Sequence, residues 1–277
     1  MCYTLRVYIG EVKVMHFDRK RNRALRDIYR IQEWIHFLGF PILGYLFTAQ
    51  EVNLLEMLLP VVCTFLIGSY AFSLNEICEE GFGGKRLFYP LISLLFTVPF
   101  FFIFSSYRTV ILSICIILSL IYSSPFPELK SKPILCTLCN AAGDPLLFLL
   151  GCSKIDDTVI LFYFMLFFLI SSAQLIHEQA HKSEDVEKRY VTTAIYLGVK
   201  KVKISIVLCM VASCVLATLL NRGLAFWIFL SGVSIFYLIF IKKIKFQTLR
   251  KIFKWEAIFI GVYMFWWLIK DFFNLRV

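Results

Sequence analysis

Three polar segments of this chain place acids and bases at spacings that could bind a cation and a phosphate group. In the first segment Asn75 and Glu79 lie four residues apart, so on a helix both side chains share one face and can grip a hard cation through oxygen. In the second segment, residues 122–133, three prolines favour a rigid turn that presents Lys130 and Lys132 to a phosphate. Taken singly, each segment is better explained as a solvated helix end or a lysine-rich turn.

The third polar segment has two incompatible interpretations. The pattern His177-Glu178-x-x-His181 matches the signature of zinc proteases, in which two histidines on one helical face bind zinc and the glutamate is the general base. Alternatively, Glu178, His181 and Asp185 form one stripe at positions i, i+3 and i+7 of a continuous helix, facing a cation and its phosphate ligand. The zinc interpretation needs a third ligand, for which Asp144 is the candidate inside an apolar segment.

The composition indicates which elements must position these residues. Hydrophobic residues make up 59% of the 277 positions and only 17% are charged, against roughly 25% charged in soluble domains. Apolar runs of about 20 residues match the hydrocarbon thickness of a bilayer. The sequence therefore predicts an all-α, polytopic membrane bundle of nine transmembrane helices. Their expected ranges are 34–48, 54–74, 87–104, 109–123, 134–152, 158–176, 203–220, 224–241 and 255–273.

The chain before the first apolar run is expected to differ from the rest. Residues 1–33 are predicted to form a cytoplasmic N-terminal extension, and residues 34–277 the nine-helix membrane domain. Within the extension, residues 18–33 read as a basic amphipathic helix suited to anionic lipid headgroups. Residues 1–17 alternate weakly, which fits either a small β element or a disordered tail.

The formal net charge of +10 does not indicate nucleic-acid binding, because Lys and Arg lie between the apolar runs rather than on one soluble face. With the N-terminus in the cytoplasm, eight of the 29 basic residues fall in the tail before residue 34 and sixteen in loops on the same side. Only five fall on the opposite side. By the positive-inside rule, this asymmetry predicts a multi-pass integral membrane protein in the lipid bilayer whose active face is cytoplasmic.

In order and spacing, the three polar segments resemble the motifs of the UbiA superfamily of intramembrane prenyltransferases. The family's first motif, Asn-x-x-x-Asp-x-x-x-Asp followed by Lys-Arg, is matched by Asn75, Glu79, Gly83 and Lys85-Arg86. Its middle loop, Tyr-Ser-x-x-Pro and then Leu-Lys, is matched by Tyr122-Ser123 and Leu129-Lys130. Its second motif, Asp-x-x-Asp-x-x-x-Asp followed by Thr and Leu-Gly, is matched by Glu178, His181, Asp185, Thr192 and Leu197-Gly198.

The resemblance implies an active site that opens on the cytoplasmic side, where Mg²⁺ holds a prenyl diphosphate. The metal ligands that it implies are Asn75, Glu79, Glu178 and Asp185. The catalytic residues that it implies are Glu178, His181 and Asp185, and the diphosphate-binding residues are Lys85, Arg86, Tyr122 and Lys130. Where the family's first motif has two aspartates, this chain has a glutamate and a glycine, so the number and identity of the metal ions stay open.

The function implied by the resemblance is membrane-embedded transfer of a prenyl group from a prenyl diphosphate to an acceptor that the sequence does not identify. Cyclisation of a prenyl diphosphate, or transfer of a sugar phosphate to a polyprenyl phosphate, fits the same superfamily. A zinc intramembrane protease acting through His177, Glu178 and His181 is the alternative from another class. A non-catalytic lipid-binding descendant is a further alternative, because acids of the motifs are substituted. Prenyl chain length and oligomeric state are left open.

Overall fold

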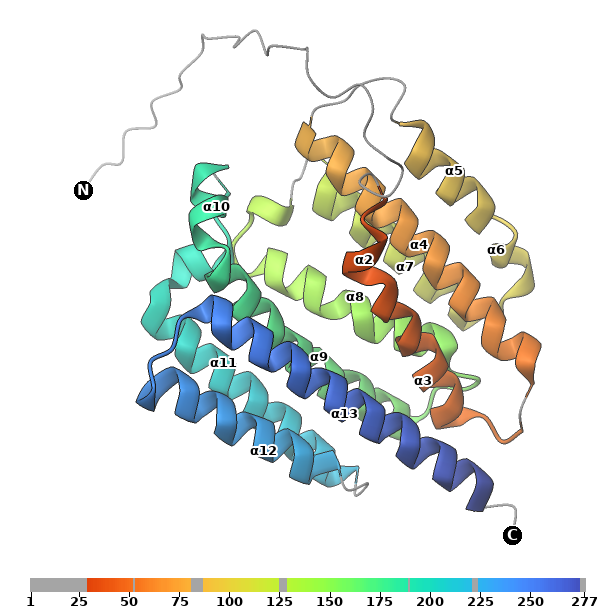
Figure 1. Cartoon of the computed structure of the whole chain (residues 1–277). Coiled ribbons are helices and arrows are strands. Elements are labelled where there is room, and N and C mark those ends of the chain that lie inside the picture. Colours follow the sequence, from red (N-terminus) through yellow and green to blue (C-terminus); the bar gives the residue numbers. More distant parts are fainter. Residues whose placement is uncertain are drawn as a thin grey trace, which may run out of the picture.

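The computed structural model describes residues 29–51, 53–80, 87–124, 129–188, 190–220 and 224–274. Throughout these ranges the regular structure is helical and no strand occurs, which confirms the all-α fold class. The long helices lie side by side in an oblique bundle (Figure 1). The alternating residues 1–17 and most of the basic segment 18–33 lie outside the described ranges.

In chain order the elements are α2 (Ile31–Trp34), η1 (Ile35–Leu38), α3 (Gly39–Thr48), α4 (Leu54–Glu80), α5 (Phe88–Thr97), α6 (Phe100–Ile103), α7 (Ser106–Ser123), η2 (Leu129–Ser131), α8 (Leu135–Gly151), α9 (Asp157–Ala180), α10 (Lys182–Glu187), α11 (Thr193–Leu219), α12 (Leu224–Phe236), η3 (Tyr237–Ile241) and α13 (Phe246–Asn274). The elements η1 and η2 are 3-10 helices, and η3 is a π-helical turn.

Each of the nine predicted apolar segments coincides, within the described residues, with one helix or with consecutive helical elements. Among the described residues, four helices, α4, α7, α9 and α11, are long and apolar enough to cross a membrane. Four further apolar segments in the same ranges are shorter, namely Ile35–Thr48, Phe88–Ile103, Leu135–Gly151 and Ile228–Ile241. Large apolar side chains such as Leu95 and Phe102 are exposed on the outside of the bundle, as expected where helices meet lipid. The chain is therefore an integral membrane protein.

Several helices extend beyond the apolar ranges that the sequence predicts. The helix α11 begins at Thr193 instead of near 203, and α13 begins at Phe246 instead of near 255. Hydropathy marks only the part of a helix that matches the hydrocarbon, whereas backbone hydrogen bonding continues into the polar turns at its end. The first turns of α11 are set off by a kink at Gly198, whose φ of 72° is a conformation that glycine adopts at little cost.

The helices α3 and α8 cross with their backbones in close contact. A β-carbon on Gly44 would collide with the carbonyl oxygen of Phe148, and a β-carbon on Gly151 with that of Pro41. Small residues permit such an approach between membrane helices. On its other side, α8 packs against α9, where the ring of Phe148 stacks on the ring of Phe162 with centroids 4.8 Å apart. These two contacts hold α8 in the middle of the bundle.

The start of the described chain is attached to the bundle through Trp34. Its indole ring is fully buried and lies 5.4 Å from the ring of Phe65 and 6.0 Å from that of Phe72, both in α4. The indole Nε1 donates a hydrogen bond to the carbonyl oxygen of Tyr29 at 2.7 Å. Trp34, the first residue after the predicted extension, is therefore packed on α4.

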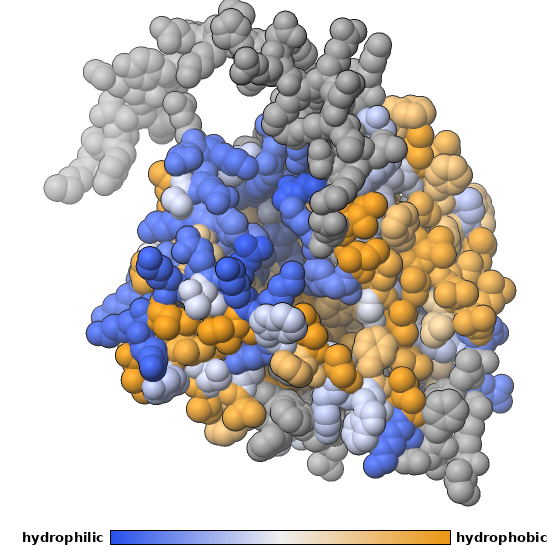
Figure 2. Space-filling model, viewed as in Figure 1, coloured by the Kyte–Doolittle hydropathy of each residue, from blue (hydrophilic) through white to orange (hydrophobic). Residues whose placement is uncertain are grey.

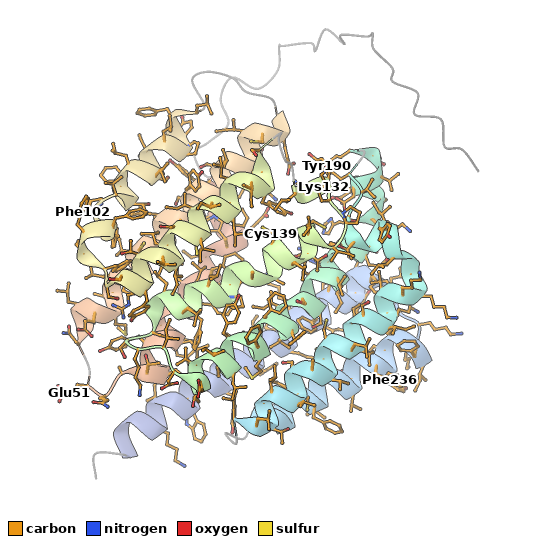
Figure 3. The ribbon with its side chains drawn as sticks, turned by 180° about the vertical axis from the view of Figure 1, so that it is seen from behind. Glu51, Phe102, Lys132, Cys139, Tyr190 and Phe236 are labelled. Carbon is orange, nitrogen blue, oxygen red and sulfur yellow. The ribbon has the colours of Figure 1, made fainter. Side chains whose placement is uncertain are left out.

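Polar elements gather at one end of the bundle. The C-terminal end of α4, the turn η2, the short helix α10 and the start of α11 meet there (Figure 1). The space-filling view shows hydrophilic side chains over this end and hydrophobic ones over the side formed by α4, α5 and α6 (Figure 2). Seen from behind, Lys132 and Tyr190 lie together at the polar end, whereas Glu51 lies at the opposite end (Figure 3). The fold thus brings the three polar segments of the sequence together.

Candidate functional site

Glu79 is the centre of the polar end. Its Oε1 accepts a hydrogen bond from Asn75 Nδ2 at 2.9 Å, one helical turn earlier in α4. The same oxygen accepts a hydrogen bond from Lys130 Nζ in η2, and this ammonium group also donates to Asn75 Oδ1 at 3.4 Å. The other oxygen, Oε2, accepts from Lys188 Nζ at 3.0 Å, just after α10. Asn75 and Glu79 therefore share one helical face, and lysines from two distant segments converge on it.

Two residues beside α10 complete this group. The Nζ atom of Lys130 lies 4.9 Å from the ring centroid of Tyr190, a cation–π contact. Asp185 is half-buried, and this burial raises the pKa of its carboxyl group against the opposing positive charge of Lys130. The pKa of Lys188 is also raised, because its ammonium group donates a hydrogen bond to Glu79. We refer to the six residues together as the Glu79 cluster: Asn75, Glu79, Lys130, Asp185, Lys188 and Tyr190.

Glu178 has a different set of partners from the one expected. Its side chain is only 3% exposed. Its Oε1 accepts hydrogen bonds from Thr137 Oγ1 at 2.7 Å and Gln174 Nε2 at 3.3 Å, and its Oε2 accepts from the backbone N–H of Ala194 at 3.1 Å. The Ala194 N–H belongs to the first turn of α11, where backbone donors have no partner within the helix. Glu178 thus joins α8, α9 and α11 through uncharged donors.

The predicted stripe of Glu178, His181 and Asp185 does not form, because the helix is interrupted. The helix α9 ends at Ala180, and Asp185 belongs to the separate helix α10. Spacings of three and seven residues place side chains on one face only while a helix is continuous. The three side chains therefore lie in three different environments, and only Asp185 is beside the lysines of the Glu79 cluster.

His181 is held by two neighbours, one at each ring nitrogen. Arg250 Nη1 of α13 lies 2.5 Å from Nε2, and Glu184 Oε2 lies 2.9 Å from Nδ1. A guanidinium group can only donate, so Nε2 accepts and Nδ1–H donates to Glu184. This hydrogen bond lowers the pKa of Glu184. Both ring nitrogens are therefore engaged by protein partners, and neither is directed to a ligand.

The zinc-protease interpretation gains little from the geometry. The rings of His177 and His181 lie close, with centroids 4.6 Å apart. Within the described ranges, however, no group of three or more His, Cys, Asp and Glu side chains could hold a metal ion. Both ring nitrogens of His181 already have protein partners, so neither is placed to bind zinc. The carboxylate of Glu178 is enclosed by its own hydrogen bonds and is not placed to act as a general base.

Two of the four expected diphosphate-binding residues, Tyr122 and Lys130, lie within the described residues. Lys85 and Arg86 lie outside the described residues. The hydroxyl of Tyr122, at the end of α7, accepts a hydrogen bond from Asn140 Nδ2 of α8 at 2.9 Å. Tyr122 is therefore directed toward α8. Of the two described residues, Lys130 is the one that contacts Glu79.

Sequence reasoning missed two contributors to this end of the bundle. Lys188 follows Asp185 by three residues, a spacing that places both on one side of a short helix and that could have indicated it. Thr193, not the neighbouring Thr192, joins the network around Glu178. Its Oγ1 lies 2.6 Å from Thr137 Oγ1, within hydrogen-bond distance, and accepts from the backbone N–H of Ile134 at 2.8 Å.

Solved structures resemble this arrangement closely in fold. A UbiA homologue from Archaeoglobus fulgidus superposes with a TM-score of 0.72 at 15% identity, covering 88% of this chain and 98% of that one. The chain has the UbiA fold. The UbiA homologue bound to GPP and Mg²⁺ gives a TM-score of 0.67 at 15% identity, covering 88% and 99% of the two chains. A digeranylgeranylglyceryl phosphate synthase gives 0.72 at 17% identity, covering 89% and 98%.

The sequence by itself matches no protein-family model and no curated protein. The expected resemblance to UbiA proteins is confirmed by the structures, at the level of the fold and over most of the chain. At this low identity, the roles of individual residues have to be argued from the geometry of this chain alone.

The donor atoms at the polar end of this UbiA fold suit Mg²⁺. Asn75, Glu79 and Asp185 offer carbonyl and carboxylate oxygens, the hard ligands that Mg²⁺ prefers. An all-protein cage is not present among the described residues. Mg²⁺ in enzymes that bind phosphates commonly takes one or two carboxylates and completes its shell with phosphate oxygens and water. The residues therefore fit a cation that is shared with a phosphate ligand.

Proposed function

We propose that this chain is a membrane-embedded prenyltransferase, which transfers a prenyl group from a prenyl diphosphate to an acceptor. The observation that carries the proposal is the Glu79 cluster, in which an acid from α4 meets Lys130 and Lys188 at one end of a UbiA fold. Solved UbiA homologues of this fold have been captured with GPP or DMAPP together with Mg²⁺. A cluster of oxygen ligands beside two ammonium groups suits the same class of ligand.

Each residue of the cluster has a role in this proposal. Asn75, Glu79 and Asp185 hold Mg²⁺, which when bound neutralises charge on the departing diphosphate. Lys130 and Lys188 donate charge-assisted hydrogen bonds to the phosphate oxygens, and these bonds strengthen as negative charge develops on the leaving group. Lys85 and Arg86, outside the described residues, are proposed to add further donors, and Tyr122 to border the site from α7.

Glu178 and His181 are proposed to act as positioning residues. Glu178 fixes the start of α11 on α8, and His181 ties the start of α10 to Arg250 of α13. Both contacts set the place of α10 and the segment after it, which carry Asp185, Lys188 and Tyr190. The resemblance implies metal-binding or catalytic roles for Glu178, His181 and Asp185. In this proposal only Asp185 of these three keeps such a role.

The orientation of the site follows from charge. We propose nine membrane-spanning segments with the N-terminus and the Glu79 cluster on the cytoplasmic side, because 24 of the 29 basic residues belong to the N-terminal tail and the loops on that side. The prenyl chain would lie among the apolar helices, where side chains meet a lipid-like chain without loss of hydrogen bonds. The acceptor and the oligomeric state are not part of the proposal.

The proposal can be tested with the purified chain in lipid nanodiscs. Prenyl diphosphates of several lengths are supplied with Mg²⁺ and a lipid extract, and both diphosphate release and prenylated products are measured, the latter by mass spectrometry. We expect release and a prenylated product, and loss of both in Glu79→Gln. The matched control is Glu51→Gln, which removes an exposed acid at the opposite end of the bundle (Figure 3).

Other outcomes would assign the chain to one of the alternatives. A cyclic hydrocarbon formed without an acceptor would indicate a cyclase, and a sugar-phosphate product the corresponding transferase. Binding of a prenyl diphosphate without release would indicate a non-catalytic descendant. Zinc-dependent peptide cleavage that is lost in His177→Ala would replace the proposal with a protease. If no prenyl diphosphate raises the thermal midpoint or is turned over, the proposed function is wrong.

A further inference from the structure

The starting observation is that both oxygens of one carboxylate are held by lysines. Glu79 Oε1 contacts Lys130 and Glu79 Oε2 contacts Lys188 at 3.0 Å. The lysines come from segments 51 and 109 residues away along the chain. A metal ion that approached Glu79 alone would meet two ammonium groups already in place. It would have to displace them and then remain beside their unpaired positive charges.

The two lysines differ in how firmly they are held. Lys130 has three partners, because besides Glu79 it contacts Asn75 Oδ1 and the ring of Tyr190, and its side chain is 19% exposed. Lys188 is 53% exposed. Within the described part of the chain, Glu79 is its one hydrogen-bond acceptor. Lys188 is therefore the lysine that can leave Glu79 most readily for a new anion.

The charges of the cluster decide how many metal ions it needs. The carboxylates Glu79 and Asp185 are balanced by Lys130 and Lys188. A bound prenyl diphosphate adds about three negative charges at neutral pH. Counted over these four described residues, a single divalent cation then leaves about one negative charge, whereas the same two carboxylates without the lysines would need a second cation to reach that value. Two ammonium groups thus supply the charge of one further divalent ion.

We propose that this site takes a single divalent cation, that the cation enters only together with the diphosphate, and that Lys188 supplies part of the charge of a second ion. The inference rests on the proposed function in that the anion is a prenyl diphosphate. On entry, the phosphate oxygens accept the hydrogen bonds of Lys188, and Glu79 Oε2 becomes available to the cation. Diphosphate and cation therefore bind with strong mutual dependence, and neither reaches full affinity alone.

The test counts bound metal with Mn²⁺, a hard divalent cation whose free form is measured by electron paramagnetic resonance. The full chain in nanodiscs is titrated with Mn²⁺ alone and then with geranyl thiolodiphosphate, which resists departure of its diphosphate. We expect almost no bound Mn²⁺ without the thiolodiphosphate, and one Mn²⁺ per chain with it. In Lys188→Gln we expect affinity for the thiolodiphosphate to fall about tenfold, the worth of one charge-assisted hydrogen bond, and Mn²⁺ binding without it to rise.

Two matched variants make the result specific. Lys182→Gln removes a lysine at the start of α10, the short helix that Lys188 follows, and Lys182 is not among the partners of Glu79. This variant should change neither quantity. Lys188→Arg keeps the charge and should restore most of the affinity. Two Mn²⁺ per chain, or Mn²⁺ binding that is equal with and without the thiolodiphosphate, would overturn this inference while the proposed function stands. Absence of any thiolodiphosphate binding would overturn both.

Discussion

Two glutamates at the same end of the bundle are stabilised in opposite ways. Glu79 meets two ammonium groups from distant segments, and its side chain is 18% exposed. Glu178 is only 3% exposed and accepts hydrogen bonds from a hydroxyl, an amide and a backbone N–H. Charged partners on flexible side chains can be exchanged for a ligand, whereas uncharged donors fixed to helices cannot. The comparison separates a binding carboxylate from one that holds helices together.

The largest effect that we expect is on stability, from Glu178→Ala. The substitution leaves the Thr137 hydroxyl and the Ala194 N–H without their acceptor inside the bundle, and each such loss costs about 1–3 kcal/mol. We expect a total of about 3 kcal/mol, which corresponds to a fall of roughly 6 to 12 °C in the thermal midpoint. Thermal unfolding in detergent, followed by circular dichroism, measures it.

Glu79→Ala is the matched control for this prediction. The ion pairs of Glu79 are only partly buried, and Lys188 is 53% exposed. Pairs that solvent still reaches contribute about 1 kcal/mol or less. Its midpoint should stay within about 4 °C of the unmodified chain. If Glu79→Ala destabilised the bundle as much as Glu178→Ala, the distinction between the two carboxylates would fail.

The second effect concerns turnover and compares neighbouring lysines. Lys130→Met removes the ammonium group that contacts Glu79, Asn75 and the Tyr190 ring. Because a hydrogen bond to a charged group is worth about 1.5–3 kcal/mol, we expect kcat/KM to fall by about 10- to 100-fold. Steady-state diphosphate release measures the change.

The control for the lysine comparison is Lys132→Met, two residues further along the chain. Lys132 lies at the same end of the bundle (Figure 3) but is not part of the Glu79 cluster. Its removal should change kcat/KM by less than about threefold, because a solvated charge contributes little at this range. Equal losses in both variants would point to general surface charge instead of a defined contact.

The smallest effect is on the dependence on pH and involves Asp185. Burial raises the pKa of this carboxyl group above its ordinary value of about 3.9, so Asp185 becomes protonated at a higher pH than an exposed aspartate. Metal binding needs the ionised form. Diphosphate-dependent Mn²⁺ binding should therefore weaken as pH falls through this raised pKa, and Asp185→Asn should remove that part of the profile.

The same shift has a consequence for stability with the opposite sign. An acid whose pKa is raised in the folded state contributes stability below its unfolded pKa and loses that contribution as pH rises through the folded pKa. Asp185→Asn should therefore leave the bundle slightly more stable at neutral pH and unchanged at acidic pH. A thermal midpoint that fell at neutral pH would contradict this account of Asp185.

The sequence was sufficient for the helices and for part of the site. Apolar runs predict where helices lie, because lipid offers the backbone no hydrogen-bond partner outside the helix. The shared face of Asn75 and Glu79 could be predicted from the helical repeat alone. The break after Ala180 was not predictable in this way, because the residues on either side of it continue a helical pattern. The contact of Lys188 with Glu79 spans 109 positions and depends on how α10 is turned, which spacing along the chain does not encode.

The crossing of α3 and α8 has a consequence for how a long hydrocarbon chain could enter the protein. The backbones of these two helices touch at Gly44 and Gly151, so they cannot slide past one another without collision. The crossing of α3 and α8 is therefore a rigid part of the bundle. The helices α5 and α6 lie at the periphery, where α5 packs on α4 and α6 on α7 (Figure 1). Any separation of helices that admits a hydrocarbon chain from the bilayer is therefore expected on the side of α5 and α6, not at the α3–α8 crossing.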